Sequence, residues 1–95
     1  MKNDRLLMAK KSYLTSLKDK LNRQYLREKS AETKADRRWI NGFMAAGYHG
    51  GLITLSELKL ECLSAYRRIY EKRMERAGEM QLERRLTKLC EESRY

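Results

Sequence analysis

Basic side chains are the residues of this chain best suited to chemistry, because lysine and arginine neutralise phosphate groups. Residues 1–38 hold twelve of them against five acidic side chains, a net charge of +7, whereas residues 39–95 contribute only +2 of the total +9. We therefore expect the N-terminal third to contact an anionic partner. The predicted nucleic-acid-binding residues are Lys10, Lys11, Lys18, Lys20, Arg23, Arg27, Arg37 and Arg38.

The same basic surface has other interpretations. It can be a solvated face over a leucine seam, or it can meet an acidic protein or an anionic membrane. The membrane is disfavoured because the apolar positions of the first helix are mostly single leucines, without Trp or Phe. Trp39 can stack on a nucleic-acid base, but its spacing to Phe43 favours a core position.

Catalytic and metal chemistry have little support. His49 is the only histidine, and it shares no ligand spacing typical of zinc with Cys62 or Cys90. We expect no enzyme activity, no cofactor and no metal, and we expect two buried thiols rather than a disulfide. A signal-peptide apolar region and a run of ~18 apolar residues are both absent, which predicts a cytoplasmic protein that does not enter a membrane.

The glycine-rich segment 47–53 is not a P-loop, because Leu52 and Ile53 stand where Lys-Ser/Thr should follow. We expect a turn in which Gly47 or Gly50 adopts the left-handed conformation. Tyr48 and His49 would be exposed there and are predicted to contact a partner.

The elements that must position these residues are predicted to be helices. The chain has no proline and no valine, a composition typical of an all-α fold. We expect one helical domain over residues 1–95, with a basic amphipathic helix at 1–29 and a second helix at 31–46 capped by Ser30. The apolar stripe of the first helix is Leu7, Leu14, Leu17, Leu21 and Tyr25. Trp39 and Phe43 would form the core centre, with Gly42 at a close helix contact.

A third, long helix is predicted over residues 54–92. Thr54 and Glu57 fit a capping box at its start. Gly78 marks a possible kink, because an interior glycine costs about 1 kcal/mol relative to alanine. Exposed leucines beyond it, which would form a coiled-coil contact with another copy or another chain, are Leu82, Leu86 and Leu89.

Two functions follow from these patterns. The first is a small basic accessory or regulatory protein that binds DNA or RNA through its N-terminal third. The second is a non-enzymatic interaction module, in the style of small phage or plasmid proteins, which adapts or inhibits a larger host complex. It would use the long helix and the glycine-rich loop.

Overall fold

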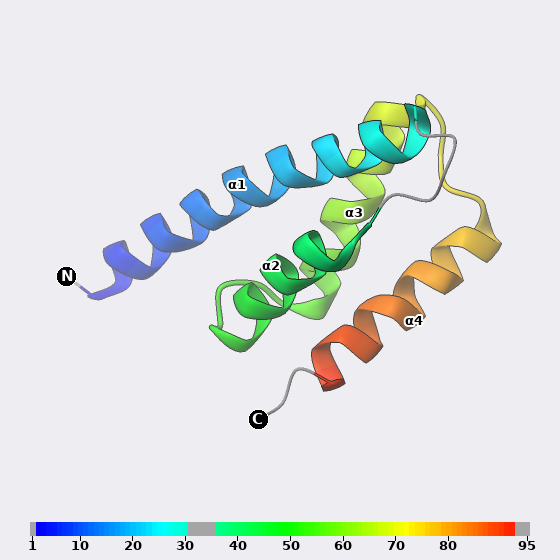
Figure 1. Ribbon diagram of the computed structural model, residues 1–95. Coiled ribbons are helices and arrows are strands. Elements are labelled where there is room, and N and C mark those ends of the chain that lie inside the picture. Colours follow the sequence, from blue (N-terminus) through cyan, green and yellow to red (C-terminus); the bar gives the residue numbers. More distant parts are fainter. Residues whose placement is uncertain (1, 31–35, 93–95) are drawn as a thin grey trace.

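The structure is a computed structural model that describes residues 2–30 and 36–92. Four helices make up this part of the chain, and no strand occurs in it (Figure 1). The all-α prediction is therefore confirmed, with four helices in place of three. The helices are α1 (Lys2–Ser30), α2 (Arg38–His49), α3 (Leu55–Tyr70) and α4 (Arg76–Glu92).

The four helices enclose one apolar core. α1 packs against α2 and α3, and α4 packs against the other sides of the same two helices. α1 and α4 therefore lie on opposite sides of the molecule (Figure 1). The largest fully buried side chains come from all four helices: Leu17, Met44, Leu58, Cys62 and Leu86.

α1 has the predicted extent, but only part of its predicted stripe is buried. Tyr13, Leu17, Leu21 and Tyr25 recur every fourth residue and face the core. Leu7, in contrast, is 53% exposed. The first turns of α1 extend beyond α2 and α3 (Figure 1), so no described helix covers the start of the stripe.

α2 begins later than predicted. Ser30 is the last residue of α1, and its hydroxyl donates back to the Leu26 carbonyl at 2.8 Å. α2 starts at Arg38, whose backbone N–H donates to Asp36 Oδ1 at 2.9 Å. The predicted start at residues 31–35 lies outside the described residues.

The predicted core position of Trp39 is wrong. Ile40, Met44 and Gly47 of α2 are buried, whereas Trp39 is 64% exposed. The close contact also lies at Gly47 instead of Gly42. A Cβ at Gly47 would lie 2.1 Å from Tyr13 Cζ, whereas a Cβ at Gly42 would meet nothing within 4 Å.

The turn after α2 is shorter than predicted, because the helix continues to His49. Gly50 has φ −80°, and the positive φ of +75° belongs to Gly51, so the glycine assignment was wrong. The capping box is confirmed: the Glu57 N–H donates to Thr54 Oγ1 at 3.2 Å, and the Thr54 N–H donates to Glu57 Oε1 at 3.1 Å.

The predicted continuous helix over 54–92 is also wrong. α3 ends at Tyr70, Glu71 takes a left-handed conformation (φ 57°), and α4 starts at Arg76. Gly78 lies in the first turn of α4 and marks no kink. The chain turns back because α4 then buries its apolar side against the other helices. Leu82 and Leu86 are consequently core residues and Leu89 is half-buried, not an exposed coiled-coil face.

Candidate nucleic-acid interface

Three aromatic rings form a stack that runs from the surface towards the core. The Trp39 and Phe43 ring centroids are 6.4 Å apart at an angle of 15°, and those of Phe43 and Tyr13 are 4.7 Å apart at 4°. The buried Tyr13 hydroxyl donates to the Phe43 carbonyl at 2.8 Å. Burial raises the pKa of Tyr13 to about 12, so this donor keeps its proton at neutral pH. The inner end of the aromatic stack is therefore fixed.

Lys20 covers the outer part of the aromatic stack. Its Nζ lies 4.7 Å from the Trp39 ring centroid and 5.0 Å from that of Phe43, which is cation–π geometry. Lys20 lies seven residues after Tyr13, two helical turns along the same side of α1. A positive charge thus stands beside a largely exposed indole.

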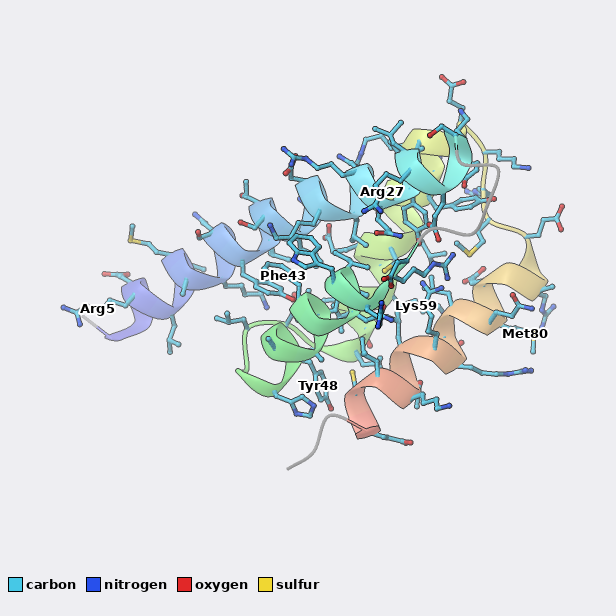
Figure 2. All side chains as sticks on the ribbon, in the orientation of Figure 1. Arg5, Arg27, Phe43, Tyr48, Lys59 and Met80 are labelled. Carbon is cyan, nitrogen blue, oxygen red and sulfur yellow. The ribbon has the colours of Figure 1, made fainter. Side chains whose placement is uncertain are left out.

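Five of the predicted basic residues of α1 divide into two sets. Each residue advances about 100° around a helix. Lys20, Arg23 and Arg27 therefore share the side that carries the contact with α2, whereas Lys11 and Lys18 lie on the opposite side. Figure 2 places Arg27 towards the C-terminal end of α1, further along that helix than the part beside Phe43.

Two of the predicted basic residues form ion pairs that link one part of the fold to another. Lys10 of α1 forms an ion pair of 2.9 Å with Glu57 of the capping box. This hydrogen bond, together with the Thr54 N–H, lowers the pKa of Glu57. Arg37 forms an ion pair with Glu28 and is half-buried. Lys10 and Arg37 are therefore poor candidates for phosphate contacts.

Two other predicted residues are paired but remain accessible. Arg38 binds the Asp36 carboxylate at 3.0 Å and lowers its pKa, yet the Arg38 side chain is 91% exposed. Arg23 binds Asp19 at 3.2 Å, one turn away, and is 77% exposed. Exposed pairs of this kind contribute about 0–1 kcal/mol. A phosphate can therefore compete with either carboxylate.

The predicted partner-binding residues do not form one surface. Leu82 and Leu86 lie in the core, as described above. Tyr48 is half-buried against exposed His49, with ring centroids 5.1 Å apart in edge-on geometry. Figure 2 places Tyr48 at the end of α2 that lies away from Arg27, so these two rings are separate from the aromatic stack.

The thiols and the acidic side chains offer no second centre. Cys62 and Cys90 are free and buried, as predicted. Burial raises the pKa of Cys62 to about 12, so its thiol remains protonated. Among the described residues, no three His, Cys, Asp or Glu side chains gather as a metal site would require. None of the described helices has the length and apolar character needed to cross a membrane.

The most important surface residue that sequence analysis misplaced is Trp39. The signal was the alternative stripe Ile40, Met44 and Gly47, which has helical spacing and leaves Trp39 at its edge. No protein-family model, curated protein or solved structure matches this chain. The interface is therefore argued from its own residues.

Proposed function

We propose that the protein binds single-stranded nucleic acid at the surface formed by Trp39, Lys20, Arg23, Arg27 and Arg38. The observation that carries this proposal is the exposed indole of Trp39, which lies beside the basic side of α1. A base of any sequence can stack on an exposed aromatic ring, while nearby cations bind the phosphates. Bases in a duplex are already stacked, so an unpaired strand suits this surface better.

The basic residues supply affinity, and the indole supplies the preference for unpaired bases. Phosphate contacts are insensitive to sequence, because they recognise only the backbone. Lys20, Arg23, Arg27 and Arg38 would neutralise up to four phosphates. For a single strand, the slope of log K against log salt is about −0.7 per phosphate. We therefore expect a slope of about −3.

Fluorescence anisotropy with labelled single-stranded DNA, single-stranded RNA and duplex DNA tests the proposal, at about 50 mM and 200 mM salt. We expect either single strand to bind more tightly than the duplex. Trp39 is the only tryptophan, so quenching of its emission on binding reports stacking directly. Replacing Trp39 with Ala should weaken single-strand binding about tenfold, because base–aromatic stacking contributes about 1–3 kcal/mol.

The two sets of basic residues on α1 provide a matched control. The variant Arg23→Gln/Arg27→Gln and the variant Lys11→Gln/Lys18→Gln each remove two positive charges from the same helix. Only the first pair should weaken binding strongly and reduce the salt slope. Equal losses in both variants would show non-specific attraction to a +9 protein. Unquenched Trp39 emission at saturation would exclude stacking.

The alternative is a protein-interaction module that adapts or inhibits a larger complex. Two of the leucines that would have contacted the partner, Leu82 and Leu86, are buried within the chain and cannot do so. The proposed contact between copies through α4 loses the same residues. Tyr48 and His49 remain at the surface, but they form only a small patch. We therefore rank this function second.

A further inference from the structure

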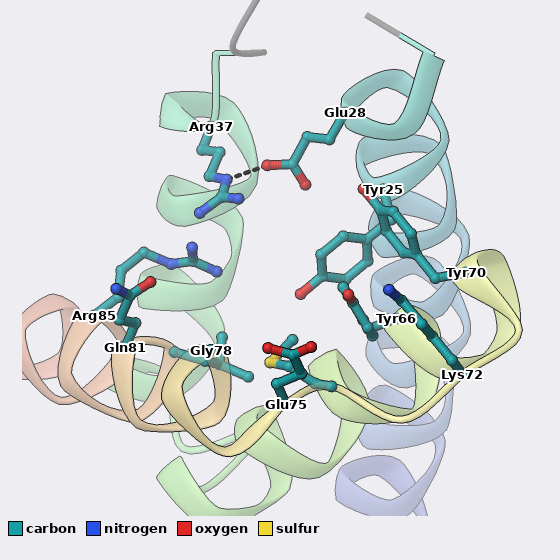
Figure 3. Close-up of a pocket in the computed structure, with 12 residues that line it drawn as sticks. Tyr25, Glu28, Arg37, Tyr66, Tyr70, Lys72, Glu75, Gly78, Gln81 and Arg85 are labelled. Atoms are coloured by element: carbon teal, nitrogen blue, oxygen red, sulfur yellow. Dashed lines mark hydrogen bonds and ion pairs between the residues drawn. The ribbon is translucent and has the colours of Figure 1, made fainter.

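A cavity of about 410 Å³ opens where α1 and α3 end and where α2 and α4 begin (Figure 3). Tyr25, Tyr66 and Tyr70 form one wall. Arg37 and Arg85 extend from the other side, so that their guanidinium groups face the rings across the opening (Figure 3). A volume of this size is within the range of small-molecule sites, about 300–1,000 Å³.

Arg85, which lines the cavity, has an unsatisfied hydrogen-bond donor. Its Nε is buried and has no hydrogen-bond partner among the described residues. Arg37 on the same side is already paired with Glu28. A buried donor without an acceptor is costly, and a guanidinium matches a planar carboxylate or a phosphate best. The guanidinium group of Arg85 faces the opening (Figure 3), so its terminal nitrogens can bind an anion that enters the cavity.

The tyrosine wall offers aromatic surface to the same ligand. The Tyr66 and Tyr70 rings stack with centroids 4.3 Å apart at 20°, and Tyr25 meets Tyr66 edge-on at 5.7 Å. Aromatic clusters of this kind accept a further planar ring by stacking or by edge contact. A ligand that joins a ring to an anionic group would satisfy both sides of the cavity.

The charges that line the cavity determine how much negative charge it can hold. Glu28 and Glu75 are acidic, and Arg37, Lys72 and Arg85 are basic, so the lining has a net charge of +1. A phosphate dianion would face repulsion from two carboxylates, whereas a monocarboxylate balances the lining. We propose that this cavity binds a small planar aromatic carboxylate, held by Arg85 and by the tyrosine wall. This inference is independent of the nucleic-acid surface.

Titration of the full ¹⁵N-labelled chain with 2-naphthoate tests the proposal by NMR. Naphthoate should produce saturable shifts at Tyr66, Tyr70 and the Arg85 Nε–H, and 2-naphthamide, which has the same shape without charge, should bind at least tenfold more weakly. Equal affinities for the two probes, or no saturable shift in the cavity, would overturn the proposal. This comparison uses the unaltered chain, so it does not depend on the folding of any variant.

Arg85→Gln adds a second test, with the exposed neighbour Arg84→Gln as its control, since both remove one charge from α4. We expect Arg85→Gln to reduce naphthoate affinity at least tenfold while naphthamide affinity stays the same. Arg84→Gln should change either affinity less than twofold. Equal effects of the two variants on naphthoate would show that general charge, not Arg85, attracts the probe.

Discussion

The two sides of α2 differ in how far their apolar residues are buried. The inner side is enclosed: Ile40, Met44 and Gly47 are buried between α1 and the other helices. The outer side carries the larger rings of exposed Trp39 and half-buried Phe43, which stack on one another. Size therefore does not decide burial in this helix. The space available opposite each position decides it.

On the inner side of α2, the close contact with α1 limits how large a side chain can be. On the outer side, no such contact limits side-chain size. The ring of Tyr13 occupies the place where a side chain at Gly47 would stand. On the outer side, Trp39 keeps apolar contact with Phe43 and a cation–π contact with Lys20 without being enclosed. Such an arrangement leaves the Trp39 indole largely exposed, and the enclosed inner side stabilises the fold.

The sharpest test of this comparison truncates one residue on each side. Met44→Ala should lower the free energy of unfolding by about 2–5 kcal/mol, because Met44 is only 1% exposed and its removal leaves a cavity. Trp39→Ala should cost at most about 1 kcal/mol, mainly through the lost contact with Lys20. Urea denaturation followed by circular dichroism measures both values. Similar losses would mean that Trp39 also belongs to the core.

The two glycines of α2 test the same contrast at smaller scale. Gly47→Ala should destabilise by about 1–3 kcal/mol, because the new methyl group displaces the Tyr13 ring and strains its hydrogen bond to Phe43. Gly42→Ala should instead stabilise by up to about 1 kcal/mol, since alanine is the better helix former and nothing stands in its way. Thermal unfolding of both variants decides the matter, and a stabilising Gly47→Ala would refute the close contact.

Signals carried by neighbouring residues predicted structure well. The extent of α1 followed from a continuous apolar stripe, and the start of α3 followed from Thr54 and Glu57, whose mutual hydrogen bonds need no distant partner. The free, buried thiols of Cys62 and Cys90 followed from their number and their helical positions. For the two helix features, the determining interactions lie within a few turns of one helix.

Features set by distant residues were mispredicted. The sequence near Glu71 contains no signal that ends a helix. Its left-handed conformation is compensated by the burial of α4 against helices earlier in the chain, which local sequence does not reveal. Phe43 and Trp39 read as a stripe just as well as Ile40 and Met44 do. The packing of α1 and α4 against α2 decides which of these positions are enclosed. The candidate interface depends on which residues of α2 are enclosed. The sequence therefore predicted its basic residues but not the exposure of Trp39.

The smallest effect we expect concerns a polar contact near the solvent, between Glu57 and Lys10. The Lys10 hydrogen bond lowers the pKa of Glu57 below the ordinary value of a glutamate, so the contact stabilises the fold at pH values above that ordinary pKa. The stabilisation is lost as the pH falls through the lower, folded-state pKa. Glu57→Gln should therefore cost about 0.5–1 kcal/mol at neutral pH, as partly exposed pairs and helix caps do, and less at about pH 3.

Urea denaturation at the two pH values measures this difference. Glu61→Gln is the control, because Glu61 lies one turn further along α3 and makes no ion pair with any described residue. A penalty for Glu57→Gln that is the same at both pH values would show that its hydrogen bonds matter and its charge does not. If the penalty instead shrinks in acid, the Lys10 charge serves to fasten α1 to the start of α3. Lys10 would then differ in role from Lys20, whose charge lies over the outer rings of the aromatic stack.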